Sequence, residues 1–179
     1  MYYAPYPNYG YMPMYNFQGN SMHHYQQMNP YNTWQHGNRN NWLDLRDYGK
    51  NPFVINIENA AEQNRAFRNA LWTGDHLQVV LMSIGVGEDI GLEVHPNTDQ
   101  FLRIEEGQGF VQMGNSRNNL TFQRRVSEDD AIMVPAGTWH NLTNTGNEPL
   151  KLYTIYAPPE HPFGTVEQTK ADAMAGERS

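Results

Sequence analysis

The chain has 179 residues, with 12 basic and 19 acidic side chains and a formal net charge of −7. This acidic balance argues against general nucleic-acid binding, because phosphate contacts need clustered lysine and arginine side chains. The absence of cysteine excludes disulfides, zinc–thiolate sites, iron–sulfur clusters and a cysteine nucleophile. No apolar run approaches the roughly 18 residues of a membrane span, and the start of the chain lacks the regions of a secretory signal. We therefore expect a leaderless, cytoplasmic protein that binds neither nucleic acid nor membranes.

Residues 1–41 differ sharply in composition from the rest of the chain. They hold eight of the eleven tyrosines and five of the nine methionines, and Arg39 is their single charged residue. They contain no Leu, Ile or Val, so they cannot build a core that offsets the loss of chain entropy. We expect a low-complexity, disordered tail. It is either passive or, because tyrosine and asparagine without charge favour β-association, a segment for self-association.

Residues 42–75 are expected to form an extended arm followed by a helix. The sequence Pro-Phe-Val-Ile at 52–55 favours an extended segment. Asn56 is a suitable N-cap for a helix over 58–72, because its side chain can accept a bond from a free backbone N–H. Apolar residues of this stretch fall on one helical face, and Thr-Gly-Asp at 73–75 supplies a stop.

From His76 onward, the apolar residues come in short runs separated by Gly, Pro and Asn. About eight short strands with such punctuation are typical of a β-sandwich or barrel. The expected strands are at residues 77–84, 90–95, 100–104, 110–113, 120–126, 131–134, 139–144 and 150–156. We assign residues 76–158 to a β-barrel and residues 159–179 to a polar C-terminal tail, helical at most around 169–175.

Two stretches of the barrel region carry the strongest chemical signal. One spans residues 89–109 and contains Glu-Val-His-Pro-Asn-Thr-Asp-Gln, in which the histidine is His95. The other spans residues 129–144 and contains Pro-Ala-Gly-Thr-Trp-His, in which the histidine is His140. Two imidazoles that converge from different strands of a barrel suit a transition-metal ion.

These stretches resemble the two sequence motifs of the cupin superfamily, in particular those of small single-domain cupins described as mannose-6-phosphate-isomerase-like. In the second motif, four residues agree in type and spacing: Pro135, Gly137, His140 and Asn144. In the first motif, His95 and Gly107 agree, whereas Asn97 replaces a histidine and Gln100 replaces a glutamate. The resemblance implies an all-β cupin jelly-roll β-barrel, preceded here by a short N-terminal helical arm and the disordered Tyr/Asn-rich tail.

The resemblance also implies a metal site, which is reduced in this chain. The expected ligands are His95, His140, Gln100 and Asn97, and the expected ion is Fe, Mn, Ni, Cu or Zn. Because alternate residues of a strand point to the same face, His95 and Asn97 can share the barrel interior. Amide oxygens bind divalent transition metals less well than imidazole or carboxylate. We therefore expect weak binding that fails as the pH falls through the histidine range.

Strand register favours Gln100 over its neighbour Asp99 as the inward-facing residue. An inward Asp99 would carry Arg103 and Glu105 into the barrel, and burial of that charged pair is costly. With Gln100 inward, Asp99 lies in the preceding turn, near the site but outside it.

Two further residues have a structural and a functional interpretation. Glu93 is expected to be a half-exposed carboxylate at the barrel rim, with a second-sphere acid near the metal as the alternative. His161 is expected to anchor the C-terminal segment by packing.

Several classes of function remain open at this point. One is a cupin that binds, and if enzymatic converts, a small polar ligand at the metal, as a sugar isomerase or dioxygenase of cupin type would. Another is a non-catalytic binding module. A third is a structural or surface-layer protein, spore-coat-like, with the barrel as scaffold and the tail for assembly. Whether the protein is an enzyme does not follow, because one fold hosts many chemistries. Exposed sheet edges also lead us to expect a homodimer in which the arm packs on the neighbouring subunit.

Overall fold

The computed structural model describes residues 42–176, so the tail predicted at 1–41 lies outside the described residues. Within residues 42–176 there are nine strands and two short helices. The helices are α1 (Ile57–Gln63) and α2 (Lys170–Gly176). The strands are β1 (Arg68–Thr73), β2 (Gln78–Ile84), β3 (Asp99–Glu106), β4 (Gln108–Gly114), β5 (Phe122–Ser127), β6 (Ala131–Val134), β7 (Trp139–Asn144), β8 (Leu150–Ala157) and β9 (Val166–Glu167).

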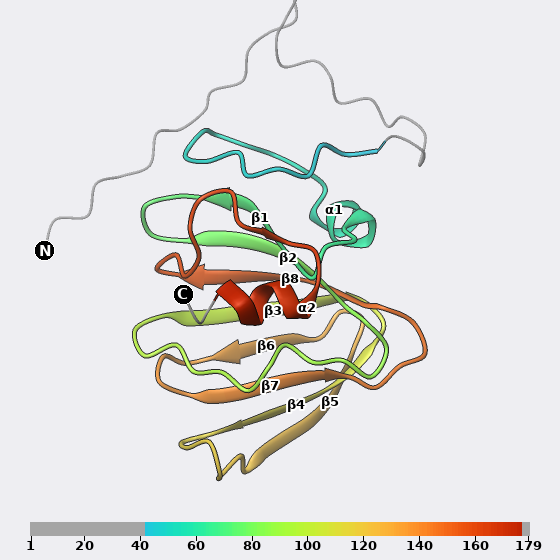
Figure 1. The fold of residues 1–179 in the computed structure, drawn as a ribbon, viewed down its shortest axis with the longest axis vertical. Coiled ribbons are helices and arrows are strands. Elements are labelled where there is room, and N and C mark those ends of the chain that lie inside the picture. Colours follow the sequence, from blue (N-terminus) through green and yellow to red (C-terminus); the bar gives the residue numbers. More distant parts are fainter. Residues whose placement is uncertain (1–41, 177–179) are drawn as a thin grey trace, which may run out of the picture. The chain divides into compact units, whose positions relative to one another are not determined.

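The strands form two antiparallel sheets, arranged as a jelly-roll barrel (Figure 1). The larger sheet has six strands in the order β6-β3-β8-β2-β1-β9, and the smaller has three in the order β5-β4-β7. Neighbouring strands are distant in sequence: Gln100 of β3 lies opposite both Val134 of β6 and Tyr156 of β8. The expected all-β jelly roll with an N-terminal helical arm is confirmed.

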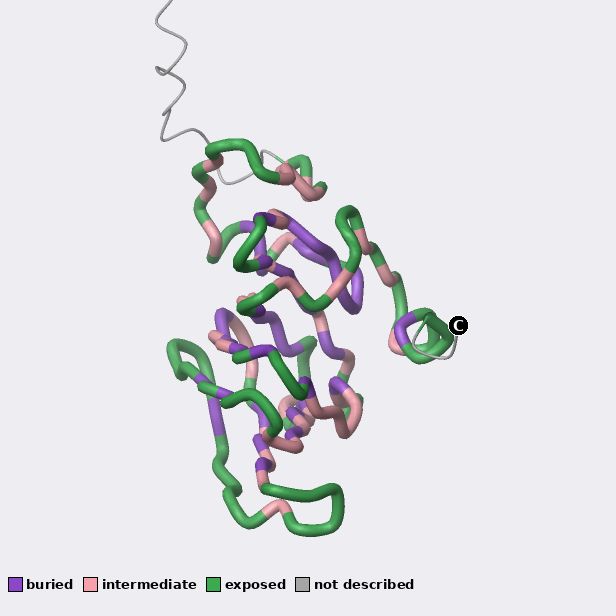
Figure 2. Tube along the Cα trace, turned by 90° about the vertical axis from the view of Figure 1, so that its left-hand side faces the viewer, coloured by how far each residue is buried: buried purple, intermediate pink, exposed green. Residues whose placement is uncertain are grey.

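The main core lies between the two sheets, because inward positions on the strands are apolar at every second residue. On β3, Gln100, Leu102 and Ile104 are buried, as the predicted register requires. Glu105, which the same register predicts to be exposed, is buried as well, next to an irregularity in the pairing of β3 with β8. Figure 2 shows the buried positions gathered along the strands, whereas the arm has only intermediate and exposed ones. The core cluster also includes Val80, Met82, Val111, Ile132, Leu142, Leu152 and Tyr156.

A second, smaller cluster lies on the outer face of the larger sheet. Leu71 of β1 and Leu81 of β2 pack there against Ala60 and Ala61 of α1. Partly buried side chains of the arm add to it: Leu43, Leu45, Tyr48, Phe53 and Ile55. The arm therefore covers a sheet of its own chain.

The helix expected over residues 58–72 is wrong in its second half. Asn56 is its N-cap as predicted, because its Oδ1 accepts a 3.0 Å bond from the N–H of Asn59. The helix ends at Gln63, however, since Asn64 has extended backbone and its side chain binds the carbonyl of Ala66. Of the apolar residues that suit a helical face, Ala60 lies in α1, whereas Leu71 belongs to β1. On β1, Ala70 packs in the main core and Leu71 in the outer cluster, so the two residues face opposite sides of the sheet.

Two other segments differ from the expected pattern. Residues 90–95 contain a single isolated β-bridge, at Glu93, and do not form a strand. The region expected to be a polar tail returns to the barrel, where β9 pairs with β1 and α2 places Ala173 in the main core. Neither helix in residues 42–176 is long and apolar enough to cross a bilayer.

Candidate metal centre

Backbone hydrogen bonds join the two sequence motifs at one end of the barrel. Glu93 and His140 form an isolated antiparallel bridge in which each N–H donates to the other's carbonyl, at 3.0 and 2.9 Å. The carbonyl of His95 accepts a 2.8 Å bond from the N–H of Gly137. Gly137 has a φ of +78°, a backbone conformation that glycine adopts without strain. The turn before β7 thus holds His140 against the irregular segment that carries Glu93 and His95.

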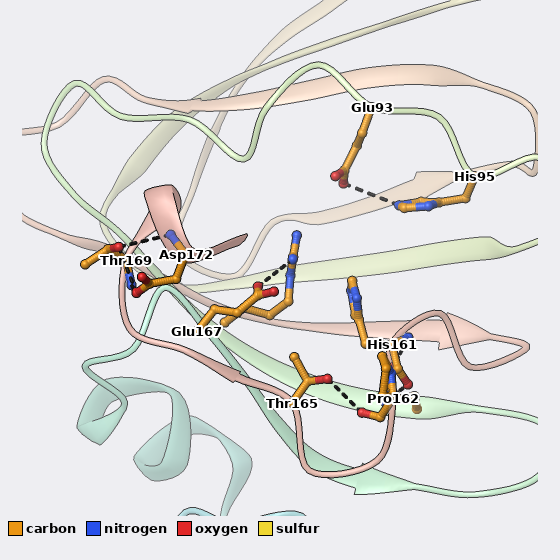
Figure 3. Close-up of polar contacts among 10 residues, drawn as sticks. Glu93, His95, His161, Pro162, Thr165, Glu167, Thr169 and Asp172 are labelled. Atoms are coloured by element: carbon orange, nitrogen blue, oxygen red, sulfur yellow. Dashed lines mark hydrogen bonds and ion pairs between the residues drawn. The ribbon is translucent and has the colours of Figure 1, made fainter. Parts of the chain in front are cut away.

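Three side chains converge at this junction: Glu93, His95 and His140. The Oε1 of Glu93 lies 3.4 Å from Nε2 of His95 and 3.3 Å from Nε2 of His140. One ligand atom from each of the three residues lies within 4.8 Å of the other two. Figure 3 shows the Glu93 side chain directed at the imidazole of His95. We call these three residues the Glu93 cluster.

The second nitrogen of each imidazole is held by a group outside the cluster. Nδ1 of His140 is 3.0 Å from the carbonyl oxygen of Thr138, and Nδ1 of His95 is 3.1 Å from Oε1 of Glu160. An Nδ1–H that donates to an oxygen leaves Nε2 with a lone pair. Both Nε2 atoms are buried and have no hydrogen-bond partner. Metal-binding histidines usually have this arrangement, in which one ring nitrogen is held by an oxygen and the other is free to bind the ion.

The charges of the cluster suit a cation. Burial alone would raise the pKa of Glu93, but the adjacent His140 and His95 lower this pKa to about 2. Glu93 is thus an anion at neutral pH. Burial alone would lower the pKa of His95, yet Glu93 and Glu160 raise it above that of an ordinary histidine. Two imidazoles and one carboxylate are a ligand set that divalent transition metals bind, so the cluster could hold such an ion.

Comparison with known proteins gives the same fold and family. The family model described as "Cupin domain" matches residues 80–156. The chain is 69% identical over 135 residues to the protein YrkC of Bacillus subtilis, covering 75% of this chain and 73% of that relative. The chain belongs to the cupin superfamily. A crystal structure of BH2720 from Bacillus halodurans is also 69% identical, with a TM-score of 0.72 over 73% of this chain and 98% of that one. The protein L612 of Acanthamoeba polyphaga mimivirus is 39% identical over 116 residues, covering 64% of this chain and 71% of that relative.

In this cupin, the structure brings together only two of the four residues predicted as metal ligands. His95 and His140 come together, as described above. Gln100 is buried on β3, where its Nε2 donates to Oγ1 of Thr154 at 3.1 Å and its Oε1 has no partner. Asn97 is exposed in a turn, so the expectation that it shares the interior face with His95 does not hold. The reason is that residues 93–98 are not a regular strand and do not alternate between faces.

The sequence interpretation of this cupin underestimated two carboxylates. The sequence predicts that Glu93 lies at the rim, or alternatively acts as a second-sphere acid, whereas the structure places its carboxylate among the candidate ligands themselves. Glu160 follows β8 and lies outside both motifs, so no sequence signal pointed to it. His161 anchors the C-terminal segment as expected: its ring packs edge-on against Tyr156 at 5.1 Å, and its backbone exchanges two hydrogen bonds with the side chain of Gln78.

Proposed function

We propose that the Glu93 cluster holds a divalent transition-metal ion and that the ion binds a small polar ligand inside the barrel. One observation carries this proposal: two buried Nε2 atoms, on His95 and His140, face one carboxylate and have no hydrogen-bond partner. A bound ion of this kind polarises an oxygen of the ligand or activates a bound water molecule. The protein's own contribution is to orient the two imidazoles and to supply the anionic ligand.

The distances within the cluster support an ion in preference to a simple ion pair. Two ligand atoms each 2.0–2.2 Å from a tetrahedral ion lie roughly 3.4 Å apart. The distances from Glu93 to His95 and His140 are 3.4 and 3.3 Å. Both contacts are longer than the 2.7–2.9 Å of an ordinary charge-assisted hydrogen bond, and neither Nε2 atom has a hydrogen-bond partner. An ion placed between the three ligand atoms would satisfy all of them at once.

Glu93 changes the ligand set that the sequence alone suggested. Two imidazoles and two amides offer no negative charge, whereas the cluster includes a carboxylate that is ionised at neutral pH. We therefore propose tighter binding than the sequence indicated. Gln100 is assigned to the lining of the site, because its free Oε1 can contact the ion's ligands. Asn97 has no role in this proposal.

The test is metal titration of the full chain, purified without a histidine tag and stripped with a chelator. Zn²⁺ and Ni²⁺ are expected to bind with a stoichiometry of one ion per chain in isothermal titration calorimetry. His140→Asn and Glu93→Gln are expected to weaken binding at least tenfold, because each removes one ligand. Asn97→Ala is the matched control and should bind as the parent does. Binding that is equal in all four proteins would contradict the proposal.

A further inference from the structure

Arg68, on β1, places a buried guanidinium in the interior of the barrel. On β1, Ala70 belongs to the main core, whereas Leu71 belongs to the outer cluster and Asn69 donates to a carbonyl of the arm. Because side chains alternate along a strand, Arg68 shares the inward face with Ala70. Arg68 is only 2% exposed to solvent. Arginine is almost never buried to this extent unless its donors are paired.

The pairing of Arg68 is incomplete. Its Nη1 lies 2.6 Å from Oε2 of Glu167, which comes from β9. Its Nε is buried and has no hydrogen-bond partner. A guanidinium has five N–H donors, and it binds carboxylates through two parallel bonds. One carboxylate therefore leaves part of this donor set free inside the barrel.

His161 contributes a second free polar atom in the same region. Its Nε2 is buried and unpartnered, while its ring is fixed by Tyr156 and its backbone by Gln78. Burial and the charge of Arg68 lower the pKa of His161 to about 3, so the imidazole is neutral. A neutral imidazole fixed in this way can donate one hydrogen bond from Nε2 to an anion.

Tyr156 connects this region with the metal centre. Its ring contacts His161 at 5.1 Å on one side and His95 at 5.5 Å on the other. Burial acts to lower the pKa of Arg68, whereas the negative charges of Glu167 and Glu93 act to raise it. In Figure 3, Glu93, His161 and Glu167 project from different segments toward a common space.

The unpaired donors at this place favour an anion. The charge of a divalent ion would be offset by Glu93 and by Glu160 beside His95, and the Arg68–Glu167 pair is neutral. The attraction for an anion therefore comes from the free N–H groups of Arg68 and His161 and not from a net positive charge. A carboxylate could place one oxygen at an open position of the ion and the other against the free donors of Arg68 and His161. The surroundings limit its size, since Arg68, His140 and Tyr156 are at most 2% exposed.

We propose that Arg68 and His161 form an anion subsite beside the Glu93 cluster, and that the ligand of this cupin is a small carboxylate. This inference rests on the proposed metal centre, because the ion supplies one of the two anchoring points. It assigns two residues outside both sequence motifs to ligand recognition. Arg68 pairs with the negative charge of the ligand carboxylate, and Nε2 of His161 donates a hydrogen bond to that carboxylate.

The experiment measures metal binding first and anion binding second, on the full chain. Acetate is titrated into the Zn²⁺-loaded protein and followed by calorimetry, with acetamide as the neutral probe of similar shape. Acetate is expected to bind at least tenfold more tightly than acetamide. His161→Phe and the double variant Arg68→Met/Glu167→Gln should each weaken acetate binding at least tenfold while Zn²⁺ affinity stays within threefold. Arg65→Met, which changes an exposed arginine, is the matched control.

The variants keep the two proposals separable. The double variant removes both members of a buried pair, so no charge is left uncompensated, and its circular dichroism spectrum reports the fold. Equal affinities for acetate and acetamide, or unchanged acetate binding in both variants, would overturn the anion subsite. If Zn²⁺ does not bind, the metal centre fails, and acetate is titrated into the metal-free protein. Binding that depends on Arg68 would then still support the subsite, and its absence would overturn it.

Discussion

Oε1 of Glu160 lies 3.1 Å from Nδ1 of His95, so a residue that follows the last long strand holds an imidazole of the first motif in place. Carboxylates that accept from the second nitrogen of a metal-binding histidine fix the ring and raise its basicity. Glu160 thus acts as a positioning residue for the proposed centre, although it does not face the ion.

Replacing Glu160 by glutamine is expected to lower the Zn²⁺ affinity about 10- to 100-fold, because the ring of His95 loses its charged partner. Competition with a chromophoric chelator measures this change. The pKa of His95 in the metal-free protein, followed by NMR, should fall at the same time, since Glu160 helps to raise it. Glu128→Gln, at an exposed site, is the control. A lower affinity with an unchanged pKa would contradict the positioning role.

Metal binding should release protons, with a defined pH dependence. Neighbouring carboxylates raise the pKa of His95 against the effect of burial, so the metal-free protein keeps this proton to a higher pH than an ordinary histidine would. Glu93 has a pKa of about 2 and releases none. Affinity is therefore expected to fall as the pH drops below the raised pKa of His95. Calorimetry in two buffers with different ionisation enthalpies gives the number of protons, and a value of zero at pH 6 would contradict the expectation.

The metal-free protein should lose stability in acid through His161. Its pKa is about 3 in the folded protein, against 6.5 for the ordinary group, because burial and Arg68 oppose the charge. The unfolded chain therefore takes up a proton first, and stability falls from about pH 6.5 toward pH 3. His161→Phe cannot take up this proton and should lose about 2 kcal/mol less than the parent between pH 6.5 and 5. Urea unfolding at several pH values measures this difference, and identical pH slopes would refute it.

Asn144 of the second motif is expected to have a structural role. It is buried, and its Nδ2 donates to the carbonyls of Ile84 and Glu148 at 2.9 and 2.8 Å, while its Oδ1 accepts from the N–H of Gly146 at 2.9 Å. Asn144→Ala should lower the free energy of unfolding by about 2–4 kcal/mol, because buried groups lose their partners. Asn118→Ala, at an exposed site, should cost less than about 0.5 kcal/mol.

Zn²⁺ affinity should stay unchanged in Asn144→Ala. It is measured without urea, at a temperature at which the variant is folded. A parallel loss of affinity would mean that this asparagine also supports the metal centre.

Much of the barrel could be predicted from the sequence, because its strands follow a simple alternation. The cost of burying charge correctly indicates that Gln100, Leu102 and Ile104 are buried on β3, but it does not predict that Glu105 is buried too, in an ion pair with Arg103. The prediction failed where two periodicities competed. Residues 58–72 contain apolar residues that suit both a helical face and a strand with two buried faces. The second half of this stretch forms the strand β1, because side chains pack against both of its faces.

The candidate site was only partly predictable. His95 and His140 could be paired from the motif spacing, which reflects two backbone segments joined by hydrogen bonds. Asn97 was misplaced, because the turn after His95 breaks the strand alternation. Glu160 could not be found, since its contact with His95 depends on how the chain returns after β8. Contacts of this kind are set by the tertiary path of the chain and have no local signature.

The return of the chain after β8 has a consequence for the comparison of related proteins. The family match covers residues 80–156 and includes both motifs, whereas Arg68, Glu160 and His161 all lie outside it. Two relatives can therefore share every motif residue and still differ in the groups that surround the centre. If the proposed anion subsite determines ligand preference, sorting relatives by the residues aligned with these three positions would separate subgroups with different ligands, even where their barrels superimpose.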